Sequence, residues 1–386
     1  MCPGLGHDGA MVLIDASIID STGLRHLVDE LRRRGFTVVG PTLRDNAIVL
    51  AELESAGELP FGWGVDVAPG TYRLRRRTDS AAFGHSAGPQ SWKQFLHPQR
   101  QRVWSSDGSD PEPAPRYAFL GVRGCDLAAI RVLDGVLAGA AHPDGSYTGR
   151  RSGAFIVGVN CTEPGGLCFC ASMGTGPGCG PRSGYDLALT ERVEVGVDGE
   201  SVSYFVDVGS ATGAEVLAAV PHRPATATEC AGAEAEVAAA VTAMGRQMPD
   251  TDLRQLLIDS RESPHWESVA SRCLTCGNCT MVCPTCFCTS SIETTDLTGE
   301  HAERWTEWAS CFELDFTFIH EGPVRRSGAS RYRHWLTHKL SSWHDQFGNS
   351  GCVGCGRCIA WCPTGIDITE EMGVLDAQRN GEPGDD

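Results

Sequence analysis

Apolar positions in the first part of the chain follow a helical period and then a strand period. Four residues have the i, i+3, i+4, i+7 spacing of one helix face: Leu24, Leu27, Val28 and Leu31. Gly35 stands where a glycine commonly ends a helix. Runs rich in β-branched residues at 36–39 and 47–50 then predict two short strands.

A second set of runs predicts parallel strands joined by a helix. Residues 117–122 and 155–159 are continuous apolar runs typical of buried strands, and 127–137 between them has a helical pattern. This order predicts a βαβ unit. Residues 192–197 and 201–206 alternate apolar and polar positions around Asp198-Gly199, which predicts an antiparallel hairpin.

The pattern changes in the second half. Residues 221–224 (Pro-His-Arg-Pro) read as a linker, 231–244 as an alanine-rich helix, and strand signals fade after about residue 245. Six of the nine tryptophans lie in this last third: Trp266, Trp305, Trp308, Trp335, Trp343 and Trp361. Such bulk either fills an ordinary helical core or encloses a cofactor.

Length and charge narrow the class of protein. The 386 residues predict two or three domains, and the net charge of −17 argues against a general binder of nucleic acid or anionic membranes. An uncharged apolar run of about 18 residues, which a transmembrane helix needs, is absent from the sequence. The first residues lack the pattern of a signal peptide, so we expect a cytoplasmic protein.

Cysteine spacing carries the chemistry, since eleven of the 18 cysteines fall between Cys273 and Cys362. Two runs share one spacing: Cys273-x2-Cys276-x2-Cys279-x3-Cys283-Pro284 and Cys352-x2-Cys355-x2-Cys358-x3-Cys362-Pro363. Ferredoxins with two [4Fe–4S] clusters have this pattern, and the fourth cysteine of each run ligates the other cluster. Three closely spaced thiolates bind three corner irons of a cubane from one turn, and the fourth comes from elsewhere.

This crossed rule predicts two ligand sets. The first cluster is expected on Cys273, Cys276, Cys279 and Cys362. The second is expected on Cys352, Cys355, Cys358 and Cys283. The alternative is a pair of zinc sites, because C-x2-C is also a zinc signature, but zinc sites need neither the third step nor the proline.

The 68 residues between Cys283 and Cys352 show no strand alternation, so we expect helices to bring the two runs together. The predicted fold class is α+β. It comprises an α/β domain (1–225) with a further iron–sulfur site, a helical linker (226–262) and an α-helical ferredoxin domain (263–386) carrying two [4Fe–4S] clusters.

A third group of cysteines belongs to the predicted βαβ unit. Cys125 and Cys161 follow the two parallel strands, and loops at the carboxyl ends of such strands meet at one edge of the sheet. The second loop also holds Cys168 and Cys170. We therefore expect a third [4Fe–4S] cluster here; zinc and buried free thiols are the alternatives.

The remaining features carry less weight. We expect structural roles for Cys179, Cys286, Cys288 and Cys311, although one could replace an assigned ligand. A basic run is either a solvated face, a docking surface or a charge that stabilises a reduced cluster; it comprises Arg325, Arg326, Arg331, Arg333, His334, His338 and Lys339. The sequence shows no catalytic motif, so we expect a subunit that transfers electrons rather than one that catalyses a reaction.

Several stretches resemble the beta subunit of NAD(P)-linked sulfhydrogenases, which are [NiFe]-hydrogenases that also reduce sulfur, and the related iron–sulfur subunit of anaerobic sulfite reductase. The resemblance rests on residues 119–127 (FLGVRGCDL), the loop 161–170 ending Cys-Phe-Cys, residues 283–288 (CPTCFC), 308–311 (WASC) and 352–358 (CVGCGRC).

The resemblance implies an electron-transfer subunit of a hetero-oligomer. Its partners would be a flavin subunit that binds NAD(P), a catalytic large subunit and a small iron–sulfur subunit. One alternative is the same role in a sulfite reductase. The alternative of another class is a zinc-stabilised interaction scaffold without redox activity.

Overall fold

A computed structural model describes residues 2–5, 11–14, 16–86, 88–109, 113–181, 183–196 and 199–381. Its centre is an eight-stranded sheet in the order β13-β3-β12-β11-β10-β9-β4-β5. The strands are β3 (Ser17–Asp20), β4 (Thr37–Arg44), β5 (Ala47–Glu52), β9 (Tyr117–Arg123), β10 (Phe155–Val159), β11 (Leu187–Gly196), β12 (Gly199–Val208) and β13 (Arg223–Pro224). The pairs β4–β9, β9–β10 and β10–β11 are parallel, which confirms the predicted βαβ unit.

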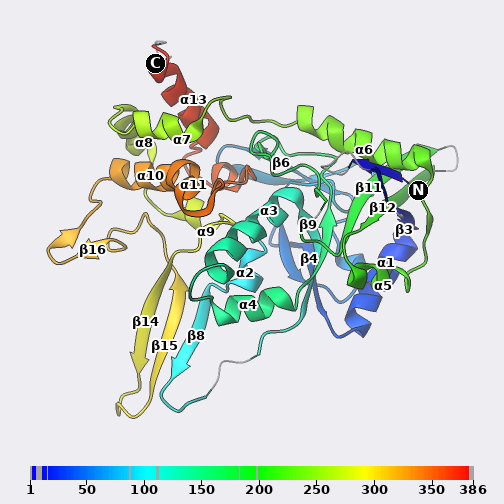
Figure 1. The fold of residues 1–386 in the computed structure, drawn as a ribbon, viewed down its shortest axis with the longest axis horizontal. Helices are drawn as coiled ribbons and strands as arrows, with labels where there is room; N and C mark the ends of the chain where they lie inside the picture. The colour runs from blue at the N-terminus through cyan, green and yellow to red at the C-terminus, as the bar shows by residue number, and fades with distance from the viewer. Residues whose placement is uncertain are drawn as a thin grey trace.

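Helices cover both faces of this sheet (Figure 1). Neighbouring strand residues enter opposite cores, as Leu120 and Phe119 do. On one face α1 (Ser21–Arg33) contributes the four predicted apolar residues, begins where Asp20 accepts a hydrogen bond from Gly23 N at 2.8 Å, and is followed by Gly35 with φ +81°. On the other face lie α3 (Gly124–Leu133) and α4 (Gly145–Ser152).

The remaining elements of the first half are short. They are β1 (Cys2–Leu5), β2 (Met11–Ile14), η1 (Ala56–Glu58), β6 (Trp63–Ala68), β7 (Thr71–Arg76), α2 (Lys93–Leu96), η2 (Asp134–Ala138), α5 (Ala211–Leu217) and α6 (Ala227–Thr242). The predicted hairpin is β11–β12, although its central residues 197 and 198 lie outside the described residues.

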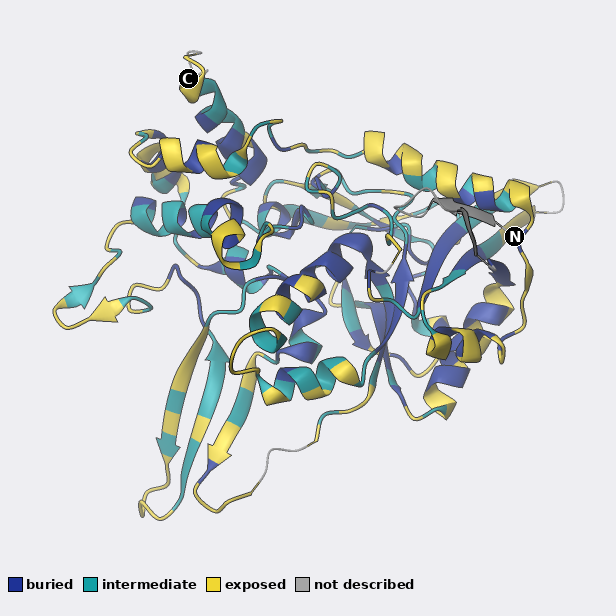
Figure 2. Ribbon diagram, in the orientation of Figure 1, coloured by how far each residue is buried: buried dark blue, intermediate teal, exposed yellow. Residues whose placement is uncertain are grey.

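The C-terminal part is a cluster of helices with a core of its own. Its helices are α7 (Leu253–Asp259), α8 (His265–Arg272), α9 (Asn278–Met281), α10 (Gly328–Thr337), η3 (His338–Ser342), α11 (Trp343–Phe347), α12 (Arg357–Ala360) and α13 (Ile368–Arg379). Trp266, Trp335 and Met372 are buried in this core, against which five motif cysteines pack. Figure 2 shows the buried residues of α10 and α13 turned inward. Mixed helix and sheet confirm the broad α+β class.

The segment between the two cysteine runs differs from the prediction. It forms a hairpin of β14 (Thr289–Thr295) and β15 (Ala302–Trp308), and a shorter one of β16 (Phe318–Ile319) and β17 (Gly322–Pro323). The expectation of helices alone is therefore wrong here. Strand β15 pairs antiparallel with β8 (Arg100–Ser105) from the first half, so the arm in Figure 1 joins distant parts of the chain.

The predicted domain limits stay a prediction. Helix α6, which begins in the proposed linker, packs Cys230 and Ala233 against Ile18 and Phe205 of the sheet. Among the described residues, the helices are all too short or too polar to cross a membrane.

Candidate iron–sulfur centres

The two cysteine motifs form the same turn. Between their cysteines, Thr275 (φ +51°) and Gly277 (φ +73°) match Gly354 (φ +65°) and Gly356 (φ +74°). Left-handed residues at these two positions curl the chain tightly, so that closely spaced thiols can surround one centre. Helices α9 and α12 begin directly after the turns.

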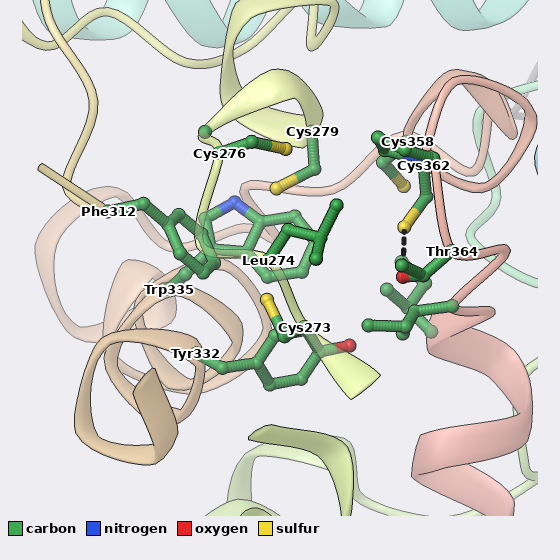
Figure 3. A pocket seen from close by; sticks show the side chains of 14 residues that line it. Cys273, Leu274, Cys276, Cys279, Phe312, Tyr332, Trp335, Cys358, Cys362 and Thr364 are labelled. Carbon is green, nitrogen blue, oxygen red and sulfur yellow. Dashed lines mark hydrogen bonds between the residues drawn. The ribbon is translucent and has the colours of Figure 1, made fainter. Parts of the chain in front are cut away.

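The four cysteines expected at the first cluster line one pocket (Figure 3). Cys273, Cys276 and Cys279 come from the first turn and Cys362 from the end of the second run; Cys358 also reaches the pocket wall. The pocket encloses about 430 Å³ of space between atoms, part of it open to solvent. Hereafter the four expected ligands are called the first thiol group.

The remaining walls of this pocket suit a sulfur-rich cofactor. Phe312, Ile366 and Ile368 supply apolar surface. Tyr332 Oη and Trp335 Nε1 also belong to lining residues, and both are buried without a hydrogen-bond partner. Buried donors are rarely left unpaired, and the sulfurs of an iron–sulfur cluster accept such hydrogen bonds. The residues therefore fit a [4Fe–4S] cluster.

Burial makes free thiolates unfavourable in this pocket. It raises the pKa of Cys273 and holds the pKa of Cys279 well above its ordinary value. Metal ligands must be deprotonated, so binding of irons would have to supply the opposing positive charge.

The second thiol group comprises the expected ligands Cys283, Cys352, Cys355 and Cys358. A buried ammonium ties its two segments together: Lys339 Nζ donates to Cys283 Sγ at 3.2 Å, to Thr285 Oγ1 at 2.9 Å and to Gly351 O at 3.3 Å. Thr285 Oγ1 donates to the same carbonyl at 2.7 Å. Cys283 is thus held beside the start of the second motif.

Electrostatics separate Cys283 from its neighbours. A hydrogen bond from Cys286 and the ammonium of Lys339 hold the pKa of Cys283 well below its ordinary value, against the effect of burial. Burial raises the pKa of Cys352 to about 12 and that of Cys355 to about 11. Lys339 is only 4% exposed, so at this residue the solvated-face interpretation of the basic run is wrong.

The third thiol group comprises Cys125, Cys161, Cys168 and Cys170. Cys125 lies in the first turn of α3 and Cys161 two residues after β10, at one edge of the sheet as predicted. The Cys170 side chain raises the pKa of Cys125 through a hydrogen bond, and burial raises the pKa of Cys168, to which Cys125 and Cys161 also contribute. The structure therefore brings the four residues together.

The loop of the third group packs directly on the second motif. Phe169 N donates to Gly354 O at 2.9 Å, and Thr175 Oγ1 donates to Val353 O at 2.7 Å. A Cβ on Gly354 would lie 2.6 Å from Cys170 N, and one on Gly356 would lie 2.4 Å from Leu167 O. Only glycine fits this approach at both positions.

The three groups lie in series. Cys355 of the second group shares an apolar cluster with Cys125 and Cys170 of the third. On its other side, Cys358 of the second group lines the pocket of the first group and contributes to the same core as Cys279. The order along the molecule is third, second, first.

The other cysteines lie beside these groups. Cys179 is close enough to Cys161 for the two to interact electrostatically, and Cys286 donates to Cys283. Cys311 is similarly close to Cys288. Sequence reasoning missed Lys93, a buried lysine whose Nζ donates to Cys286 O at 2.9 Å and lies 3.6 Å from the centre of the Trp308 ring. Burial lowers its pKa to about 8.

Single-ion geometry is a separate question. Within the described ranges, three or more His, Cys, Asp or Glu side chains are nowhere close enough together to hold one metal ion. Thiolates around one zinc ion stand about 3.8 Å apart, whereas each thiolate of a cubane binds an iron of its own.

Comparisons with known proteins extend the picture. Residues 272–366 match the 4Fe-4S dicluster domain family. The chain is 31% identical over 347 residues to sulfhydrogenase 2 subunit beta of Pyrococcus furiosus, covering 89% of this chain and 92% of that protein. The chain belongs to the sulfhydrogenase beta-subunit family. This confirms the resemblance drawn from the cysteine motifs. No solved structure gives a significant match.

Proposed function

We propose that this chain is an electron-transfer subunit that binds [4Fe–4S] clusters in a hydrogenase-type complex. The observation that carries the proposal is the series of three thiol groups, each adjacent to the next. Family membership and the dicluster domain support it. When bound, such clusters accept and release single electrons.

The proposed ligand sets are the three thiol groups as defined above. Cys362 crosses to the first group and Cys283 to the second, as in two-cluster ferredoxins. The chain contributes the thiols, the apolar walls that exclude water, and donors such as Trp335 Nε1. The third cluster would rest on the α/β part, whose loop reaches the second motif.

Exposure suggests where electrons enter or leave. Cys276 is exposed and Leu274 beside it is 64% exposed, so the first group lies at the surface. The second group is covered by the loop of the third. We propose that the second group is an internal relay and that the first exchanges electrons with a partner subunit.

The proposed partners are a flavin subunit that binds NAD(P), a catalytic large subunit and a small iron–sulfur subunit. The name of the relative, a sulfhydrogenase subunit, favours a hydrogenase or sulfur-reductase complex over a sulfite reductase. The proposed role is relay between the nicotinamide–flavin end and the catalytic end.

The test is an EPR spectrum of the anaerobically prepared chain after reduction with dithionite. Clusters in series interact magnetically, so the expected spectrum is broadened and split relative to isolated clusters. Replacing Cys355 by Ser, in the middle of the series, should remove this interaction and leave simpler signals. A wild-type spectrum without iron–sulfur signals after cluster reconstitution would contradict the proposal.

A further inference from the structure

A buried ion pair joins the second motif to the βαβ unit. Arg357 Nη1 donates to Asp126 Oδ1 at 2.9 Å, and the two side chains are only 3% and 4% exposed. Removing both charges from water is costly, and their attraction compensates only where further hydrogen bonds satisfy the remaining atoms.

Those hydrogen bonds are present. Trp92 Nε1 donates to Asp126 Oδ2 at 3.3 Å. Arg357 Nε donates to Gly88 O at 3.3 Å and to Gln90 O at 3.2 Å. The guanidinium and the carboxylate are therefore fixed in one orientation inside the protein, and neither can turn to solvent.

The pair lies at the junction of two thiol groups. Asp126 directly follows Cys125 of the third group, and Arg357 lies two residues after Cys355 of the second. Cys125 and Cys355 themselves pack in one apolar cluster with Val353. Burial would lower the pKa of Arg357, but Asp126 together with the sulfurs of Cys355 and Cys125 holds it above its ordinary value.

We propose that Arg357 and Asp126 are positioning residues that set the reduction potentials of the second and third clusters together. The proposal rests on the function proposed above. Reduction adds negative charge to a cluster, so a fixed buried cation favours it and a fixed buried anion opposes it. One pair beside both groups affects both potentials in the same direction.

The two single variants should act in opposite senses. Arg357→Gln leaves the Asp126 charge uncompensated and should shift both potentials to lower values. Asp126→Asn leaves the Arg357 charge and should shift both to higher values. In the double variant the shifts should largely cancel. A residue that only holds the fold together has no reason to produce shifts of opposite sign.

The experiment compares these variants with the wild-type chain by redox-poised EPR, after iron content has been measured in each. Signals are assigned to the second and third clusters by their loss in Cys355→Ser and in Cys168→Ser/Cys170→Ser. Arg151→Gln is the matched control, because it breaks an ion pair with Asp134 at the opposite end of α3 from Cys125. Its potentials should equal those of the wild type.

Opposite shifts of both potentials, with the first cluster less affected, would support the proposal. Full iron content with unchanged potentials, or with shifts of one sign in both single variants, would overturn it. Iron loss in both single variants would also overturn it and assign the pair to assembly alone. A wild-type chain that binds no iron would instead refute the proposed function on which it rests.

Discussion

The two cysteine motifs have one spacing and one turn, yet they lie in different environments. The first motif faces solvent at Leu274 and Cys276. The second is covered by the 161–180 loop, which contacts it through Gly354 and Gly356. Spacing therefore determines the local geometry of a motif, whereas long-range packing determines its exposure and, we propose, its place in the relay.

The strongest way to break this comparison is to exchange the residues at one position of the two turns. Gly354→Thr gives the second motif the residue of the first. It should destabilise the protein by about 3 kcal/mol or more, because a left-handed residue gains a Cβ and that Cβ meets the backbone of Cys170. Thermal unfolding and iron content would measure the loss.

The reciprocal variant is the control. Thr275→Gly gives the first motif the residue of the second, where Thr275 already has φ +51° and contacts Gly328. Its stability should stay within about 1 kcal/mol of the wild type. Equal effects of the two exchanges would contradict the difference in packing.

The crossed ligands give the next largest effect. Cys362→Ser should remove the cluster of the first thiol group, about four irons, although Cys362 belongs to the second run. Cys283→Ser should remove the cluster of the second group. EPR spectra of Cys362→Ser should match those of Cys276→Ser. If they match those of Cys355→Ser instead, the ligands do not cross.

The loop that covers the second motif can be tested by its own thiols. Cys168→Ser/Cys170→Ser should lower iron by about four per chain and leave the first two clusters in place. Cys179→Ser is the matched control, since this thiol lies in the same loop region but outside the proposed ligand set. Iron loss in Cys179→Ser with none in the double variant would reassign the site.

The smallest effect concerns the pocket of the first motif. Trp335→Phe keeps the ring but removes the unpaired indole N–H. One lost hydrogen bond of about 1 kcal/mol should lower the first potential by about 40 mV and leave the second nearly unchanged. Trp266→Phe is the control, because its Nε1 donates to Ser260 O instead. Equal shifts in both variants would argue against a bond to the cluster.

Local patterns predicted the elements that hold the thiols. The spacing of Leu24 to Leu31 gives α1, and the apolar runs give β9 and β10, so the meeting of Cys125 and Cys161 followed from topology. The strands β14 and β15 were missed because their residues are mostly polar, and β15 pairs with β8 about 200 positions earlier.

Buried charges were beyond reach for a similar reason. Arg357 and Asp126 are 231 positions apart, and neither residue indicates its partner in the sequence. Lys339 stood in a basic run and reads as surface until the fold places it on Cys283. The polar residues beside the thiol groups depend on tertiary structure, whereas the thiols themselves are visible from spacing.

The most direct test of the three-group series is the content of iron, acid-labile sulfide and zinc per chain after anaerobic production and reconstitution. Three occupied thiol groups predict about twelve irons with matching sulfide. About eight irons would contradict a cluster in the third group. Zinc without iron would contradict the electron-transfer function as a whole.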